Sequence, residues 1–192
     1  WNEFNYLDYL ALPFEEWFGC DWGKVDPWAI MGAKYDPSNN KLYVHEYLHM
    51  SEDNINDIID NETKRRIKED GEEGLVNYMF NRLDIPKKAK IVCDNNRPNK
   101  VEQLRRFGYE NAVVAEKGQG SIIDGIELLD YGVDVYYTNT SSNIKKEQDE
   151  YSWKVDRYGN VLEAPEGGKD HQLDGIKYIA TKMQAYGIIK KI

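Results

Sequence analysis

The sequence has few cysteines and no long apolar segment. Its two cysteines, Cys20 and Cys93, each stand in an apolar run, which is typical of buried core thiols and forms neither a disulfide framework nor a zinc-ligand pattern. No run of about 18 apolar residues occurs, and residues 1–14 carry acidic side chains where a signal peptide would carry basic ones. These absences favour a chain that works in the cytoplasm and does not enter a membrane.

A surplus of basic charge is also missing. The formal net charge is −9, whereas domains that coat nucleic acid by bulk electrostatics usually carry a basic surplus. Local clusters of lysine and arginine nevertheless occur around 87–106 and 145–169. Each of these side chains has two interpretations, a solvated surface charge or a phosphate contact. The charge therefore argues against a coating protein and not against local contact with nucleic acid.

The hydrophobic pattern indicates one α/β domain. Aromatic and β-branched runs at 17–21, 28–35 and 41–48 predict three consecutive antiparallel strands, and residues 51–83 predict one broken helix or two. Beyond them strands alternate with helices, which predicts a parallel portion of the sheet. The expected elements there are strands at 90–94, 112–115 and 133–137, helices at 98–107, 121–131 and about 170–186, and a hairpin over 151–162. The expected fold class is an α/β mixed sheet, three antiparallel strands then parallel βα units, flanked by helices.

Three aspartates stand at positions that only folding can bring together. Asp21 and Asp94 each end an expected strand, and Asp174 lies beside the apolar stripe of the expected last helix. Converging carboxylates repel one another unless they hold divalent cations, and Mg²⁺ and Mn²⁺ prefer oxygen ligands. Carboxylates this close should also have raised pKa values without metal. The pattern predicts a metal-dependent phosphoryl-transfer site.

Each of these aspartates also has a structural interpretation. Asp21 and Asp94 fit the role of turn formers at strand ends. Asp170 fits a helix N-cap as well as a metal ligand, whereas Asp174 is four residues further on and has no capping role. The functional interpretation is favoured because the expected fold places the end of the first strand beside the end of the fourth, where α/β sheets form their sites.

The order of several short motifs resembles the carboxy-terminal nuclease domain of tailed-phage large terminase subunits. The resemblance covers roughly residues 15 to 186, and its most specific part is the closing element His171-Gln-Leu-Asp174-Gly-Ile-Lys-Tyr178. The other parts are Gly19-Cys-Asp-Trp-Gly23 with Asp26-Pro27, Val92-Cys-Asp94 with the helix after it, Lys117 with Ser121-Ile122 and Gly125-Ile126, and Tyr151-Ser-Trp153 with Asp156 and Gly159. The departures are Gly175, where alanine is more usual, and the lack of a Gly-x-x-x-x-Gly-Lys-(Ser/Thr) phosphate loop.

The resemblance implies an RNase H-like fold and an endonuclease that cuts concatemeric viral DNA during genome packaging. It implies that Asp21, Asp94 and Asp174 are catalytic and bind two Mg²⁺ or Mn²⁺ ions, Asp21 bridging both. The implied partners are double-stranded DNA, an upstream ATPase domain, a small terminase subunit and the portal, in the host cytoplasm. Residues 1–14 are then expected to be a linker from the upstream domain, and residues 15–192 the nuclease domain.

Several side chains are candidates for secondary roles at this site. Asp170 is a further candidate metal ligand because it adjoins the third carboxylate. Asp26 fits an outer-shell carboxylate or a turn residue, and His171 fits a substrate contact or a packing residue at the helix start. The candidate substrate contacts are Lys117, His171, Arg97 and Lys100.

Three alternative functions fit part of the pattern. A resolvase or transposase on the same fold would differ mainly in its substrate. A phosphate site of the actin and sugar-kinase group would use Asp21-Trp-Gly23, although those enzymes usually need two domains and a longer chain. A non-enzymatic docking module would bind a basic partner through its acidic surface. That module predicts no metal binding and tolerance of Asp94→Asn and Asp174→Asn.

Overall fold

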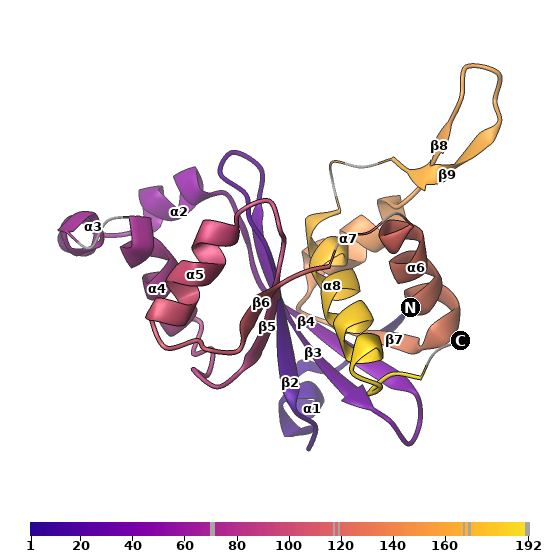
Figure 1. The fold of residues 1–192 in the computed structure, drawn as a ribbon, viewed down its shortest axis with the longest axis horizontal. Coiled ribbons are helices and arrows are strands. Elements are labelled where there is room, and N and C mark those ends of the chain that lie inside the picture. Colours follow the sequence, from indigo (N-terminus) through magenta and orange to yellow (C-terminus); the bar gives the residue numbers. More distant parts are fainter. Residues whose placement is uncertain (70–71, 117, 119, 167, 169, 191–192) are drawn as a thin grey trace.

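A mixed sheet of seven strands runs through the molecule, with helices on both faces (Figure 1). The computed structural model describes residues 1–69, 72–116, 118, 120–166, 168 and 170–190. The strand order is β1-β7-β4-β3-β2-β5-β6. The strands are β1 (Asn2–Phe4), β2 (Glu16–Asp21), β3 (Trp28–Asp36), β4 (Lys41–Met50), β5 (Lys90–Cys93), β6 (Ala112–Val114) and β7 (Asp134–Thr138).

The centre of the sheet is antiparallel and its two sides are parallel. β3 pairs antiparallel with β2 and with β4, and all nine of its residues are buried, which suits its aromatic and aliphatic sequence. The turn into β4 forms because the Asp36 carboxylate accepts backbone N–H groups of Ser38 and Asn39. β5 and β7 pair parallel with β2 and β4 respectively. The expected order of three antiparallel strands followed by parallel βα units is confirmed.

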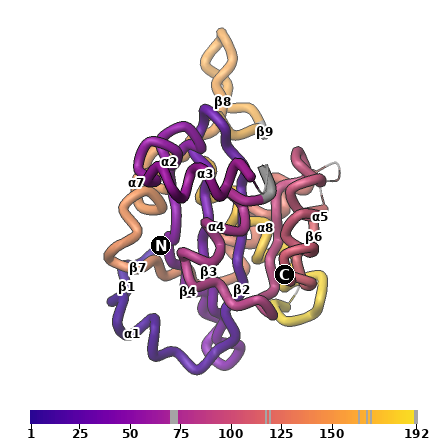
Figure 2. Tube along the Cα trace, turned by 90° about the vertical axis from the view of Figure 1, so that its left-hand side faces the viewer, coloured from indigo at the N-terminus to yellow at the C-terminus, as the bar shows by residue number. Residues whose placement is uncertain are grey.

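Two helical layers enclose the sheet, one on each face (Figures 1 and 2). One layer contains α2 (Glu52–Ile58), α3 (Asn61–Glu69), α4 (Glu72–Arg82) and α5 (Pro98–Arg106), and the other contains α6 (Ser121–Glu127), a π-helical turn (Leu128–Gly132), α7 (Ser142–Glu150) and α8 (His171–Ala185). Alternate residues of β2 face the two layers: Trp17 packs in the core with α8, whereas Phe18 and Cys20 pack in the core with α4 and α5. Among the described residues, no helix combines the length and apolar character needed to cross a membrane.

Helix α8 lies unusually close to β2 and β3. A Cβ atom on Gly19 would stand 2.5 Å from the carbonyl oxygen of Gly175, and a Cβ atom on Gly175 would stand 2.1 Å from the sulfur of Met31. Because both positions are glycine, the helix backbone rests almost directly on the strand. This contact fixes the height of α8, and therefore of Asp174, above the sheet.

The helical content differs from the expectation at residues 6–11, which form a short helix, and in two further places. The described residues of 51–83 form three helices, not one or two. The chain leaves α2 in an extended conformation at Ile59, and Asp60 caps the start of α3 by accepting the N–H and the hydroxyl of Thr63. Helix α7 was not expected from the sequence. Its start depends on a tertiary contact, since the Glu46 carboxylate on β4 accepts the N–H groups of Asn143 and Ile144.

The first residues of the chain form part of the sheet. β1 pairs parallel with β7, and α1 (Tyr6–Ala11) follows it with Tyr9 fully buried. Residues 1–14 were expected to be a linker, and that an ATPase domain precedes them stays a prediction. The structure shows that residues 2–11 are held by backbone pairing and by a buried ring.

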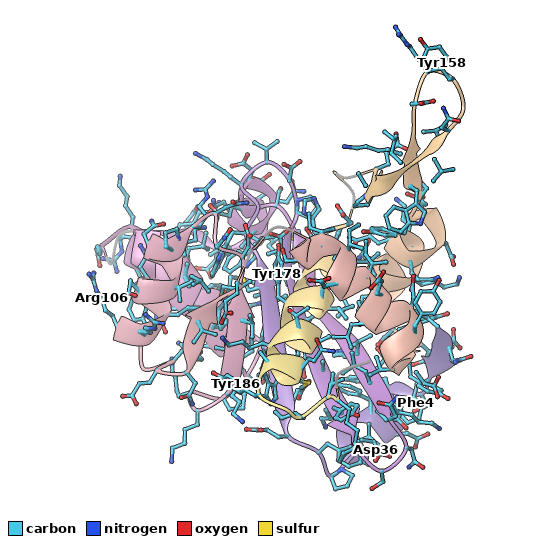
Figure 3. All side chains as sticks on the ribbon, turned by 45° about the vertical axis from the view of Figure 1, so that its right-hand side comes forward. Phe4, Asp36, Arg106, Tyr158, Tyr178 and Tyr186 are labelled. Atoms are coloured by element: carbon cyan, nitrogen blue, oxygen red, sulfur yellow. The ribbon has the colours of Figure 1, made fainter. Side chains whose placement is uncertain are left out.

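The expected hairpin near residue 156 projects from the rest of the molecule (Figure 1). It consists of β8 (Trp153–Val155) and β9 (Val161–Pro165), which form a separate sheet of two strands. Asp156 closes the turn by accepting the N–H groups of Tyr158 and Asn160, and Tyr158 lies at its tip (Figure 3). The hairpin is confirmed.

Candidate active site

Two of the three predicted aspartates end neighbouring strands. In the parallel pairing of β2 with β5, Cys20 lies opposite Cys93, and the Asp94 N–H donates to the Cys20 carbonyl at 2.8 Å. Asp21 and Asp94 are the next residues of the two strands, and both face the α8 layer because they alternate with Cys20 and Cys93. Asp94 is 1% exposed and Asp21 8% exposed. Two carboxylates are thus withdrawn from water at one edge of the sheet.

The third aspartate, Asp174, joins them from α8, and Tyr178 lies among all three. The Tyr178 hydroxyl donates to Oδ1 of Asp94 at 3.3 Å. Burial raises the pKa of Tyr178, and the charges of Asp174, Asp94 and Asp21 raise it further. The Tyr178 hydroxyl therefore contacts Asp94 and is close enough to Asp174 and Asp21 for their charges to act on it. Figure 3 shows Tyr178 near the centre of the molecule.

Each carboxylate has its own hydrogen-bond or ion-pair partner. Asp21 Oδ2 lies 2.8 Å from Nδ1 of His171, and Asp174 Oδ1 lies 2.6 Å from Nζ of Lys177. The hydrogen bond to Asp21 raises the pKa of His171 in spite of burial. Burial opposes the charged form of Lys177, but the attraction of Asp174 outweighs it and raises the Lys177 pKa. The three carboxylates therefore give the site a negative charge that the surrounding hydrogen-bond and ion-pair donors only partly offset.

The pKa of Asp174 is raised, and the main cause is burial. The negative charges of Asp170 and Asp21 add to this effect, while Lys177 acts in the opposite direction. The mutual elevation expected from the sequence is thus a minor contribution at Asp174.

The donor set suits a hard divalent cation. Asp21, Asp94 and Asp174 offer only oxygen atoms, and the thiols of Cys20 and Cys93 are buried in the opposite core. Among the described residues, no three acidic, histidine or cysteine side chains already stand in a metal-coordinating arrangement. Each carboxylate instead has a protein partner, namely His171, Tyr178 or Lys177. A cation bound by these carboxylates would compete with those partners.

Asp170 and Asp26 both lie near this centre. Asp170 occupies the N-cap position of α8, yet its side chain makes no capping hydrogen bond and instead accepts the N–H of Gly168 at 3.2 Å. Its charge contributes to the raised pKa of Asp174. Asp26 is exposed and its charge helps raise the pKa of His171. Their roles as a further ligand and an outer carboxylate stay predictions.

The predicted substrate contacts differ in their surroundings. Arg97 is exposed at the start of α5. Lys100 is buried, forms an ion pair with Glu52, and lies over the rings of Trp22 and Trp28. Lys117 lies outside the described residues. His171 is half-buried beside Asp21. As substrate contacts, all four stay predictions.

Glu147 on α7 is a residue of this region that the sequence analysis missed. Its Oε2 accepts the N–H groups of Gln172 and Leu173 at 2.8 and 3.1 Å, which satisfies the first turn of α8. Its other oxygen, Oε1, is buried and has no hydrogen-bond partner among the described residues. Burial raises the pKa of Glu147 to about 7. No sequence signal pointed to it, since α7 itself was not expected.

Replacing Glu147 with glutamine is expected to remove a pH dependence of folding stability. The pKa of Glu147 is about 7 in the folded chain against an ordinary value of 4.5, so the folded state binds the additional proton between these values. The Glu147 carboxyl group should therefore make wild type gain up to about 3 kcal/mol in free energy of unfolding relative to Glu147→Gln as pH falls from about 7 towards 4.5. The difference between the two proteins is the quantity to measure, because burial lowers the pKa of His45 to about 4 and makes both proteins lose stability over the same range. Glutamine keeps the acceptor and cannot titrate.

Urea unfolding at several pH values measures this difference between wild type and Glu147→Gln. Glu150→Gln, at an exposed position on the same helix, is the matched control and should follow wild type. Parallel pH profiles for wild type and Glu147→Gln would show that the buried carboxyl group does not titrate in this range.

Comparison with known proteins identifies the family. A model of the terminase RNase H-like domain matches residues 21–182. The large terminase subunit of Bacillus phage SPP1 is 23% identical over 163 residues, which is 83% of this chain and 34% of that protein. The chain thus spans about a third of the length of this curated relative.

Solved structures share the fold. The large terminase nuclease domain of bacteriophage SPP1, crystallised with bound Mn, superposes with a TM-score of 0.70 at 21% identity and covers 95% of this chain and 96% of that one. The nuclease domain of the P22 large terminase gives a TM-score of 0.56 at 14% identity, covering 93% and 87%. The expected RNase H-like fold is confirmed. Because the family model extends over most of the sequence and includes Asp21, Asp94 and Asp174, this chain belongs to the family of terminase RNase H-like domains.

Proposed function

We propose that this domain is a Mg²⁺- or Mn²⁺-dependent endonuclease that cuts concatemeric double-stranded DNA during viral genome packaging. The observation that carries the proposal is the convergence of Asp21, Asp94 and Asp174 on Tyr178, from two strands and one helix, at the carboxyl edge of an RNase H-like sheet. The Mn bound to the SPP1 nuclease domain supports a divalent cation here. A packaging role is supported by membership of the terminase family.

Asp21, Asp94 and Asp174 would hold two such cations, with Asp21 as the shared ligand. When bound, the cations would activate a water molecule and stabilise the departing oxygen of the phosphodiester. Before they bind, His171, Tyr178 and Lys177 hold the three carboxylates in place and offset their charge. The burial of Asp21 and Asp94 keeps bulk water away, which strengthens every charge interaction at the site.

We infer the remaining partners from the family. The matched part of this chain spans 34% of the SPP1 relative, and the full protein would add an upstream ATPase domain that moves DNA. A small terminase subunit would supply sequence choice and the portal would receive the DNA, in the host cytoplasm. The net charge of −9 fits weak binding of DNA by this domain alone.

Cleavage of supercoiled plasmid with Mn²⁺, Mg²⁺ or excess EDTA tests the proposed activity. We expect nicked and linear products with either cation and none with EDTA, because three crowded carboxylates cannot polarise a phosphodiester without a cation. Titration calorimetry with Mn²⁺ and no DNA gives an independent readout of the site. Cleavage that persists in EDTA would refute the metal mechanism, and the absence of both cleavage and Mn²⁺ binding would favour the docking module.

A further inference from the structure

A basic pocket lies on the opposite layer of the molecule from α8. It has a volume of about 440 Å³ and is enclosed by α2, α3, α4, the start of α5 and the loop that follows β2. Its basic lining residues are Lys24, Lys64, Lys68, Arg97 and Lys100, and its acidic ones are Glu52 and Asp53. The described lining residues therefore carry a net charge of +3 in a chain of net charge −9. A locally positive surface on an otherwise negative protein attracts anions.

Most of the positive charge in this pocket is not used within the fold. Lys100 is paired with Glu52, but Lys24, Lys64, Lys68 and Arg97 form no ion pair with any other described residue. Helix α3 separates its charges by face. Lys64 and Lys68, one turn apart, line the pocket, whereas its other basic residues, Arg65 and Arg66, pair with Glu69 and Glu62 on the outside. The helix thus offers two unpaired ammonium groups to one cavity.

The pocket adjoins the edge of the sheet at which the carboxylates stand. Lys24 follows Asp21 by three residues, and Arg97 follows Asp94 by three. Both loops therefore leave the same two strand ends that carry the proposed metal ligands, and both contribute to the pocket. A polyanion that occupies the pocket would pass over this edge towards Asp21 and Asp94. Figure 2 shows the layer of α2, α3 and α4 from its outer side.

We propose that this pocket binds the sugar-phosphate backbone of the DNA substrate beside the scissile phosphate, with Lys64 and Lys68 as its main phosphate contacts. The inference rests on the proposed function. A nucleic-acid backbone is favoured over other polyanions because the proposed cleavage site itself takes a phosphodiester, so that one strand supplies both the phosphate at the carboxylates and the phosphates at α3. The basic lining of this helical layer would then offset the repulsion between DNA and the acidic surface elsewhere on the domain.

The test compares two double variants of the same helix with the same change of charge. Lys64→Gln/Lys68→Gln removes the two ammonium groups that line the pocket, and Arg65→Gln/Arg66→Gln removes two paired charges on the outer face. Binding of a fluorescent DNA duplex is measured by anisotropy at several salt concentrations without divalent cations. We expect Lys64→Gln/Lys68→Gln to weaken binding about 10-fold or more and to reduce the slope of log affinity against log salt by nearly 2. Arg65→Gln/Arg66→Gln should change binding less than about 2-fold.

Two further measurements separate this inference from the proposed activity. Mn²⁺ binding and thermal unfolding should be the same in wild type and both variants, and Arg65→Gln/Arg66→Gln should cleave plasmid as wild type does. Equal effects of the two double variants, or duplex affinity unchanged by Lys64→Gln/Lys68→Gln, would overturn the pocket assignment even if wild type cleaves with metal. Unlabelled DNA and an acidic peptide can also be compared as competitors at the same concentration of charged groups. If the peptide displaced the duplex as effectively as DNA does, the pocket assignment would be overturned and a protein partner would be indicated. Absence of metal-dependent cleavage in wild type would instead refute the proposed function.

Discussion

Asp174→Asn is expected to lower metal-dependent cleavage at least about 100-fold and to destabilise the fold at the same time. The loss of activity follows from the loss of one anionic ligand among three. The loss of stability has a different cause. Lys177 is 6% exposed, and asparagine at position 174 could accept a hydrogen bond from its ammonium group but would not balance its charge. The other acceptor for this ammonium group among the described residues is the Tyr151 hydroxyl, at 3.3 Å. The uncompensated charge of Lys177 costs about 1–3 kcal/mol after allowance for the partial exposure of Asp174, and relief of the unfavourable burial of the Asp174 carboxylate offsets part of this cost.

Lys177→Met separates these two effects, because it removes the ion pair and leaves the carboxylate in place. Both variants should show a lower free energy of unfolding in urea without metal. Added Mn²⁺ should then stabilise Lys177→Met and wild type, by about 2.7 kcal/mol at a hundred times the dissociation constant, but not Asp174→Asn. Equal stabilisation of all three proteins by Mn²⁺ would remove Asp174 from the metal site.

Strands β2 to β7 and the positions of the three aspartates could be predicted from the sequence because local signals determine them, whereas β1, within the expected linker, was missed. β2, β3 and β5 are continuous apolar runs, and Asp21 and Asp94 stand where those of β2 and β5 end. The stripe of Leu173 and Ile176 fixed which face of α8 is buried, and both are in the core. The period of the hydrophobic pattern and the residues that end each apolar run were sufficient to predict these elements.

Other features depend on tertiary contacts that no local pattern encodes. Helix α7 begins on Glu46 of β4, nearly a hundred residues earlier in the chain, and Glu147 is buried only because α8 starts against it. The pairing of Asp21 with His171 likewise crosses 150 residues. The spacing of Lys177 and Tyr178, three and four residues after Asp174, did place them on one helix face, and that is the signal that could have given them a role.

Gly19→Ala is expected to damage both stability and activity, whereas Gly175→Ala should be close to neutral. The new Cβ atom at position 19 would meet the backbone oxygen of Gly175 at 2.5 Å, and a backbone in the middle of a helix cannot yield alone. Helix α8 would have to rise from the sheet, at a cost of about 3 kcal/mol. At position 175 the Cβ atom would meet the sulfur and terminal methyl of Met31, the flexible end of a side chain, and the gain of about 0.5–1 kcal/mol from replacing a helical glycine offsets that adjustment.

The two glycine variants therefore test whether the height of α8 sets the geometry of the site. Urea unfolding should show the difference in stability. Plasmid cleavage by Gly19→Ala is measured at a temperature where the variant remains folded. It should fall about 100-fold, because a displacement of about 1 Å moves Asp174 and Tyr178 away from Asp94. Gly175→Ala should retain cleavage. If Gly19→Ala were as stable and as active as wild type, β2 and α8 would not be in backbone contact, and the carboxylates would be brought together by their own hydrogen bonds with His171, Tyr178 and Lys177.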